Sequence, residues 1–308
     1  RRSARDDQQE TTNESRGQSP ADPRGGLPHG NAMSKKQRRA IPRFATPIVE
    51  THCHLDYLGE AGLGETLAAA ADVGIERVVT IAVAPDNLAT VRRIAEADAR
   101  VWCTQGIHPH EAGSYDDAVE AAIREGAAHP RVVAIGEIGL DYYYDHADLA
   151  AQRDAFARQL ALAAELALPV VIHSRDADED TEAILGEHLP GLSRRGVIHS
   201  FTSGAGLAGF ALDAGFYLGF NGITTFRNAD NVRAIVELTP VEQLLLETDA
   251  PYLTPVPYRG TTNAPCYLPF VAEKIAELKG LPVEELLAIT RRSSYALFFP
   301  GDAPALAA

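Results

Sequence analysis

From residue 47 onward, short apolar segments rich in β-branched residues alternate with longer segments in which alanine and leucine recur at helical spacing. Near-continuous apolar strands that each lead into a helix indicate a parallel sheet covered by helices. The predicted strands, eight in number, are residues 48–54, 77–83, 101–108, 132–140, 169–175, 196–201, 216–226 and 243–250. Eight units over about 250 residues predict a single-domain (β/α)8 barrel of the TIM type. An open doubly wound sheet is the alternative, but the residues after the first strand, HLDYLGEAG, lack the glycine-rich dinucleotide fingerprint.

The two ends of the chain differ from this pattern. Residues 1–44 are rich in Pro, Gly, Ser, Gln and charge, so we expect a disordered extension before a barrel at 45–300 and a flexible tail at 301–308. One hypothesis is that translation starts at Met33, the single methionine, and that residues 1–32 precede the natural protein. The basic run Lys35–Arg39 is interpreted as solvated rather than as a polyanion contact.

Polar residues gather where the predicted strands end. The carboxyl ends of barrel strands meet at one rim, so these side chains are expected to converge. The set is His52, His54, His108, Glu137, His173, His199 and Asp249. A single histidine at a strand end is more often structural, but a buried cluster of this size is costly unless something satisfies it. The set therefore predicts a metal site.

The first of these strands ends in ETHCHLD, which raises the question whether Cys53 is a ligand. Alternate residues of a strand face opposite sides, so His52 and His54 are expected to point into the barrel together. Cys53 then points toward the covering helices, and no partner cysteine stands at Cys-x-x-Cys spacing. Asp56 is interpreted as a loop residue or as a residue that supports the ligands, rather than as a ligand.

Imidazole and carboxylate ligands suit zinc, manganese or iron, and their number exceeds what one tetrahedral ion needs. We therefore expect two divalent ions that share Glu137 as a bridge. A carboxylated lysine is excluded as the bridge because the four lysines, at 35, 36, 274 and 279, lie outside the predicted strands. Two adjacent ions suit a reaction in which water displaces a leaving group at phosphorus. Asp249 could bind one ion and also accept the proton of the attacking water. Glu137 and Asp249 are thus the predicted catalytic residues.

Composition narrows the context of this chemistry. The formal net charge of −14 argues against binding of nucleic acid by bulk attraction, although bound cations can reverse the sign of a site. Three cysteines favour a reducing compartment, and no apolar run is long enough to cross a bilayer. We expect a cytoplasmic protein without a membrane partner, and a monomer is favoured.

The motifs THCHLD, GIHPH, GEIGLDYYY, VIHSR, IHSF and ETDAPYL occur in an order and spacing that resemble the TatD family of metal-dependent deoxyribonucleases, within the amidohydrolase-like barrels. The resemblance spans residues 47–298 and implies a 3′→5′ exonuclease on single-stranded DNA, supported by magnesium or manganese, with zinc as an alternative. It implies that one ion is held by His52, His54, Glu137 and Asp249, and the second by Glu137, His173 and His199. It also implies phosphate contacts from His108 and Arg175, and pocket positions for Asp141 and Tyr142.

The chain departs from the family pattern at the substrate rim. Arg259 and Asn263 are retained in PYRGTTNAPCY, but Thr261 and Thr262 replace the usual basic residues, and Ser203 is inserted after the sixth strand. These changes leave a second class open, a metal hydrolase of a small molecule or of a D-aminoacyl-tRNA ester. A binding module without catalysis is disfavoured by the complete ligand set.

Overall fold

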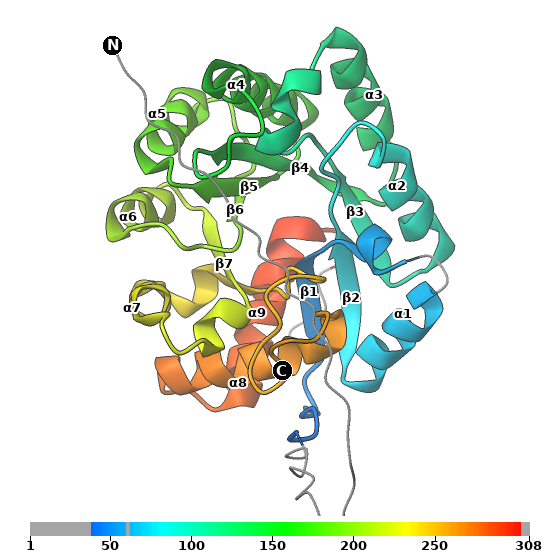
Figure 1. The fold of residues 1–308 in the computed structure, drawn as a ribbon, viewed down its shortest axis with the longest axis vertical. Coiled ribbons are helices and arrows are strands. Elements are labelled where there is room, and N and C mark those ends of the chain that lie inside the picture. The colour runs from blue at the N-terminus through cyan, green and yellow to red at the C-terminus, as the bar shows by residue number, and fades with distance from the viewer. Residues whose placement is uncertain (1–37, 60–61, 303–308) are drawn as a thin grey trace, which may run out of the picture. The chain divides into compact units, whose positions relative to one another are not determined.

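The strands form one parallel sheet in a computed structural model that describes residues 38–59 and 62–302. They are β1 Ile48–Cys53, β2 Ile75–Thr80, β3 Val101–Gln105, β4 Val132–Asp141, β5 Val170–Arg175, β6 Gly196–Ile198, β7 Tyr217–Phe220 and β8 Leu244–Leu246. Each strand pairs with the next in chain order, whereas a doubly wound sheet reverses direction at a switch point. Figure 1 shows the sheet curled into a barrel, which confirms the predicted (β/α)8 fold.

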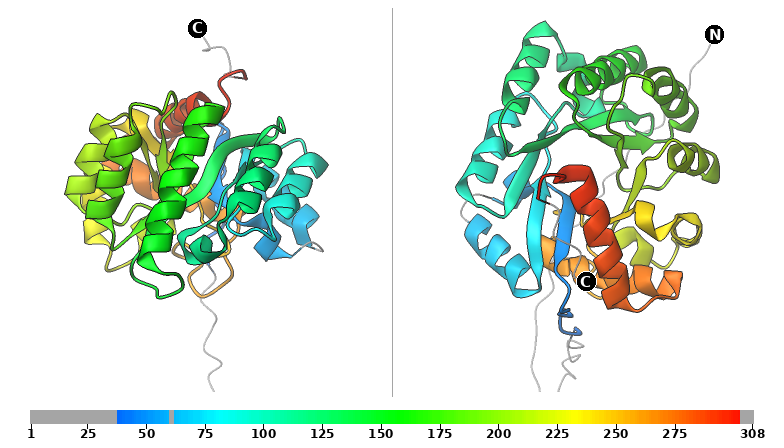
Figure 2. Two further views of the ribbon diagram at one scale, coloured as in Figure 1. Left: turned by 90° about the horizontal axis from the view of Figure 1, so that it is seen from above. Right: turned by 180° about the vertical axis from the view of Figure 1, so that it is seen from behind.

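Helices surround the sheet on its outer side (Figures 1 and 2). They are α1 Leu63–Asp72, α2 Leu88–Ala97, α3 Asp117–Ala127, α4 Leu149–Leu166, α5 Asp178–His188, α6 Ala205–Asp213, α7 Asp230–Leu238, α8 Leu268–Lys279 and α9 Val283–Phe298. Capping side chains start α3 and α4: Asp116 accepts a hydrogen bond from the backbone N–H of Val119, and Asp148 accepts hydrogen bonds from the backbone N–H groups of Ala150 and Ala151. Apolar residues at helical spacing form the buried faces of the helices. In α2 these residues are Leu88, Val91 and Ile94. No helix in the described ranges is long and apolar enough to span a bilayer.

Apolar side chains fill the barrel below the strand ends. Val49, Val79, Val171, Val197 and Leu245, each from a different strand, form a buried cluster with Tyr295, Phe298 and Phe299 at the end of α9. The guanidinium of Arg77 lies over the rings of Trp102, Tyr295 and Phe299, and it pairs with Asp302 at 3.0 Å. The N-terminal end of the barrel is therefore filled with apolar side chains. The polar side chains of the predicted site lie at the opposite end, where the strands have their carboxyl ends.

Several predicted strands extend past the observed ends, such as the second, third and sixth, which stop at Thr80, Gln105 and Ile198, and the seventh and eighth extend furthest. The seventh was expected to cover 216–226, but β7 ends at Phe220, and the side chain of Asn221 accepts from the backbone N–H of Ile223 to start a 3-10 helix, Gly222–Thr225. The eighth was expected to reach residue 250, but β8 ends at Leu246 and Asp249 adopts a left-handed backbone with φ of 57°. The side chain of Asn221 therefore ends β7 by capping the 3-10 helix, whereas after β8 the backbone turns at Asp249.

The boundary of the extension can be compared with the structure only from residue 38. Residues 38–44, which we assigned to it, contact the barrel: Arg39 pairs with Glu273 at 2.5 Å, and the carboxylate of Glu284 accepts from the backbone of Ala45 and Thr46 just beyond. The predictions for Met33, for residues 1–37 and for most of the tail lie outside the described residues.

The cysteines offer a test of this packing. Cys53 and Cys103 are 0% exposed, and burial raises the pKa of Cys53 well above its ordinary value and that of Cys103 to about 12, whereas Cys266 is partly exposed. Because the thiolate is the reactive form, a colorimetric disulfide reagent at pH 8 should modify at most one thiol quickly in the folded chain, and all three after denaturation. Fast reaction of Cys53 in the folded protein would contradict the packing described.

Candidate metal centre

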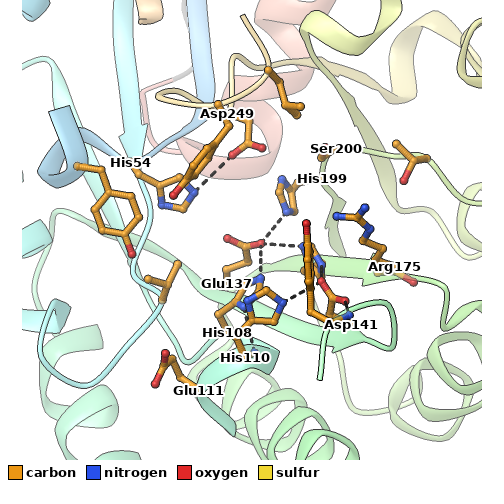
Figure 3. A pocket seen from close by; sticks show the side chains of 18 of the residues that line it. His54, His108, His110, Glu111, Glu137, Asp141, Arg175, His199, Ser200 and Asp249 are labelled. Carbon is orange, nitrogen blue, oxygen red and sulfur yellow. Dashed lines mark hydrogen bonds and ion pairs between the residues drawn. The ribbon is translucent and has the colours of Figure 1, made fainter. Parts of the chain in front are cut away.

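A cavity of about 620 Å³ opens at the carboxyl ends of the strands, where the sequence predicted the site. Six of the seven predicted polar residues line it, and the remaining one, His52, lies just beneath as a buried side chain. Those that line it are His54, His108, Glu137, His173, His199 and Asp249. Figure 3 shows the labelled members among them turned toward one another.

The carboxylate of Glu137, at the middle of β4, lies at the centre of the cluster. Its Oε1 lies 2.7 Å from His199 Nε2, 3.2 Å from His173 Nδ1 and 3.4 Å from His108 Nε2. Its Oε2 lies 3.4 Å from His52 Nε2. Glu137 is 2% exposed. One buried carboxylate therefore contacts four imidazoles that come from four other positions on the rim.

The ends of β1 and β8 place the other carboxylate. The backbone N–H of Asp249 donates to the carbonyl of His52, and the N–H of His54 donates to the carbonyl of Ala250. These bonds set Asp249 Oδ1 3.4 Å from His54 Nε2 and 3.8 Å from His52 Nε2. The left-handed backbone at Asp249 is a strained conformation for a residue with a side chain, and such strain is typical of functional sites.

The donor atoms fit divalent metal ions. Both ring nitrogens of His52 and of His199, and Nδ1 of His54, are buried without a hydrogen-bond partner in the described part of the chain. Ligand atoms within 4.8 Å of one another form three groups: His52, His54 and Asp249; His52, Glu137 and His199; His108, Glu137 and His173. Orphaned imidazole nitrogens beside carboxylates are the arrangement that a cation would satisfy.

These groups divide the residues differently from the two ligand sets expected from the resemblance. Glu137 belongs to two groups, as a shared ligand would. His199 groups with His52, and His108, expected as a phosphate contact, groups with His173 as a further residue able to hold a metal. Both roles of His108 are compatible with its place at the edge of the cavity.

The carboxylates and imidazoles of the cluster shift one another's pKa values through their contacts. Burial raises the pKa of Glu137, but the imidazoles of His199 and His108 outweigh burial and hold the pKa well below its ordinary value. Burial likewise opposes protonation of His54 and His199, yet Asp249 raises the pKa of His54 and Glu137 raises that of His199 well above normal. The carboxylates are therefore anionic, and the imidazoles of His54 and His199 attract protons, whose places a cation can take, whereas burial lowers the pKa of His52 and of His108.

Further carboxylates hold the imidazoles in place. Asp141 Oδ2 lies 3.0 Å from His173 Nε2 and also 3.0 Å from His110 Nε2. Glu247 Oε1 accepts from the backbone N–H of Ser200 and lies 3.6 Å from His199 Nδ1. Carboxylates that contact the second ring nitrogen of a ligating histidine fix its orientation and tautomer. A Cβ at Gly219 would lie 2.4 Å from Glu247 Oε2, so glycine provides the room for this carboxylate.

A buried glutamate also joins β1 to β8 beneath the metal cluster. Glu50 Oε1 accepts from the backbone N–H groups of His52 and Thr248. Burial raises the pKa of Glu50 to about 8. Glu50 thus connects the two strand ends that carry His52, His54 and Asp249.

The predicted substrate residues lie in different places. Arg175 and Asp141 line the cavity, and Arg175 is the one lysine or arginine among its described lining residues. Tyr142 is not in this cavity: its hydroxyl donates to Asp180 beside a separate hollow, and Tyr144 lines the cavity instead. Arg259 also lies outside the lining and packs over Phe226, 3.7 Å from the ring centroid.

The motif ETHCHLD is arranged as expected. Cys53 packs in the cluster between sheet and helices, with its Sγ 3.8 Å from the carbonyl of Val79, and it belongs to none of the metal-capable groups. Asp56 accepts from the side chain of Asn87 at 3.1 Å. Cys53 therefore only spaces the two histidines.

Sequence reasoning missed several residues of the cavity. His110 stands two positions after His108 in GIHPH and was not assigned a role, although the repeated histidine could have drawn attention to it. Glu247 stands in ETDAPYL, two positions before Asp249, which is the spacing that puts two side chains on one face of an extended chain. Tyr57 and Tyr252 had no signal in the sequence beyond their proximity to ligands.

The fold and the cluster define a barrel hydrolase of the metal-dependent type, and comparison with known proteins specifies the family. The family model for TatD-related DNases matches residues 49–299. The chain is 41% identical over 251 residues to an uncharacterized metal-dependent hydrolase TatD of Mycobacterium tuberculosis, covering 79% of this chain and 94% of that protein. It is 42% identical over 202 residues to the 3′-5′ ssDNA/RNA exonuclease TatD of Erwinia amylovora, covering 64% of this chain and 78% of that protein.

Solved structures agree with this match. The TatD homolog YjjV of Escherichia coli superposes with a TM-score of 0.77 at 30% identity, covering 82% of this chain and 97% of that one. The chain belongs to the TatD-related DNase family of metal-dependent hydrolases, which confirms the resemblance found in its motifs.

Removal of one ligand tests the assignment of the histidines. His54→Ala should lose at least one divalent ion per chain, because it removes a donor that faces Asp249 at 3.4 Å. Cys53→Ser should keep the full metal content, since Cys53 faces the helices. Elemental analysis of both variants after manganese loading and desalting measures the difference. Equal metal content in the two variants would be incompatible with this centre.

Metal affinity should depend on pH in a defined direction. The pKa values of His54 and His199 are raised above 6.5 in the metal-free protein, so these imidazoles gain protons as pH falls through the raised values. Each proton that a metal must displace weakens binding by about tenfold per pH unit. Calorimetric titration with Mn²⁺ should give a weaker Kd at pH 6 than at pH 8; the same Kd at both would show that these histidines are not ligands.

Proposed function

We propose that this chain hydrolyses phosphodiester bonds in single-stranded DNA, removing nucleotides from the 3′ end with two divalent metal ions. The observation that carries the proposal is the buried carboxylate of Glu137 among four imidazoles, with orphaned ring nitrogens around it. The activity named for the Erwinia amylovora relative, a 3′-5′ ssDNA/RNA exonuclease, supports the choice of polynucleotide and direction. Magnesium or manganese is proposed as the working metal, and the histidine-rich ligand set keeps zinc as the alternative.

The ligands assigned to the two ions are those that the family resemblance implies, and all of them belong to the clusters able to hold a metal. His52, His54 and Asp249 with Glu137 are proposed for one ion, and Glu137 with His173 and His199 for the second. Ions held by these residues would act as Lewis acids toward a phosphate oxygen and lower the pKa of an attacking water. Asp141 and Glu247 keep the rings of His173 and His199 turned toward the ions.

The chain's own groups supply the remaining chemistry. Burial raises the pKa of Asp249, but its hydrogen bond with His54 and the nearby imidazoles outweigh burial and lower it, so the carboxylate is free to accept a proton from the attacking water. His108 and Arg175, on the cavity wall, are proposed to contact the phosphate. The guanidinium of Arg175 suits paired hydrogen bonds with phosphate oxygens.

A second candidate is hydrolysis of a small molecule or of a D-aminoacyl-tRNA ester. The same centre can polarise a carbonyl carbon. The net charge of −14 and the single arginine among the described residues of the cavity wall favour the small molecule, because tRNA, like DNA, is a long polyanion. An exonuclease that binds only the last nucleotides of a strand would also contact few phosphates.

A degradation assay tests the proposal. The purified chain with Mg²⁺ or Mn²⁺ should shorten a 5′-labelled single-stranded oligonucleotide stepwise from its 3′ end, as followed on a denaturing gel. Asp249→Asn should reduce the rate by about a hundredfold or more because it removes both a ligand and the proton acceptor.

The control outcomes separate the two candidates. Absence of shortening with either metal, together with release of the amino acid from a D-aminoacyl-tRNA, would replace the nuclease with the ester hydrolase. Shortening at an equal rate by Asp249→Asn would indicate a contaminating nuclease.

A further inference from the structure

Exposed tyrosines are concentrated around the mouth of the cavity. The large apolar side chains exposed in the described part of the chain are Tyr57, Tyr143, Tyr144, Leu149, Leu238, Tyr252 and Val256. Four of these are tyrosines, of which Tyr57, Tyr144 and Tyr252 line the cavity and Tyr143 contacts Tyr144. Exposed aromatic surface gathered at one place indicates a binding surface.

Two of the tyrosines stand on the β1 and β8 side, against the ligand His54. The ring of Tyr57 stacks on the ring of His54 with centroids 5.3 Å apart and an interplanar angle of 18°. Tyr252 meets His54 edge to face at 6.2 Å. Tyr57 is 47% exposed and Tyr252 is 52% exposed, so each keeps much of its ring surface free.

The other two tyrosines stand on the β4 and β5 side, around Arg175. The guanidinium carbon of Arg175 lies 4.0 Å from the ring centroid of Tyr143 and 4.9 Å from that of Tyr144. Tyr144 also meets His110 edge to face at 5.5 Å. In Figure 3, Arg175 and His54 lie on opposite sides of Glu137 and His199, so the two tyrosine pairs face the metal cluster from two walls.

The hydroxyl groups of these rings differ from those of four other tyrosines of the fold. The hydroxyls of Tyr115, Tyr142, Tyr258 and Tyr295 each bond to another part of the protein. Within residues 38–59 and 62–302, the hydroxyls of the four mouth tyrosines have no such partner. Their rings and hydroxyls are therefore both available to a ligand.

We propose that Tyr57 and Tyr252 on one wall, and Tyr143 and Tyr144 on the other, form a clamp that stacks the last bases of a single-stranded nucleic acid on either side of the scissile phosphate. This inference rests on the proposed nuclease function and specifies how the strand is held. Every base has a flat face, so stacking on tyrosine binds single strands without sequence preference, and paired bases inside a duplex cannot enter. Stacking also supplies affinity where the cavity wall offers one arginine against the phosphates.

Abasic ends test the clamp directly. The substrates are two 5′-labelled oligonucleotides, one with normal bases and one with tetrahydrofuran abasic residues at its last two 3′ positions. In the wild-type chain with Mn²⁺, kcat/KM should be about tenfold higher for the normal end, since each stacked base contributes to binding. Tyr57→Ala and Tyr144→Ala should each narrow this ratio severalfold, Tyr57→Phe should restore it, and the matched control Leu238→Ala on the outer helix α7 should keep it.

A binding measurement separates failure of the clamp from failure of the nuclease proposal. The Asp249→Asn protein in Mn²⁺ should quench the fluorescence of 2-aminopurine at the 3′ terminus, and the added substitution Tyr57→Ala should lessen the quenching and weaken Kd. If Tyr57→Ala lowered kcat/KM equally for both ends, the ring would serve only to support His54 and the clamp would be overturned. If the wild type cut neither substrate but these binding differences persisted, the nuclease proposal would fail while the stacking surface stood.

Discussion

The carboxylate of Glu137 is the group on which the arrangement of the site depends. It lies at the centre of the strand ends, 2% exposed, with His199, His173 and His108 near one oxygen and His52 near the other. An isolated buried carboxylate would shift its pKa upward and become neutral, whereas this one keeps a lowered pKa because the imidazoles surround it. A barrel is suited to such a group because separate strands deliver their partners to one point.

The fold supports this carboxylate from two directions. Below it, valines from several strands and the end of α9 fill the barrel, which leaves water and ligands only the opposite end. Around it, Asp141, Glu247 and Glu50 hold the histidine rings and the ends of β1 and β8. The strained backbone at Asp249 is maintained by hydrogen bonds to β1, so the stability of the barrel sustains the geometry of the site.

The sequence predicted the barrel and the metal-capable residues because both follow from periodicity: apolar strands recur with helices, and polar residues recur where strands end. It did not predict where β7 and β8 stop, since the side chain of Asn221 caps a 3-10 helix directly after β7 and the backbone becomes left-handed at Asp249 after β8. The sequence also could not show which tyrosine of the run 142–144 lines the cavity. Which ring enters the cavity depends on the turn after β4, which directs Tyr142 to Asp180 and Tyr144 into the cavity. His108 shows the same limit, because a strand pattern places it at the rim without distinguishing a ligand from a phosphate contact.

The central claim is that two ions share Glu137, and anomalous diffraction from crystals of the manganese-loaded protein tests it most directly. The account predicts two manganese peaks on either side of the Glu137 carboxylate, one near His52, His54 and Asp249 and the other near His173. A single peak that Glu137 does not contact, or an ion bound through Cys53, would contradict it.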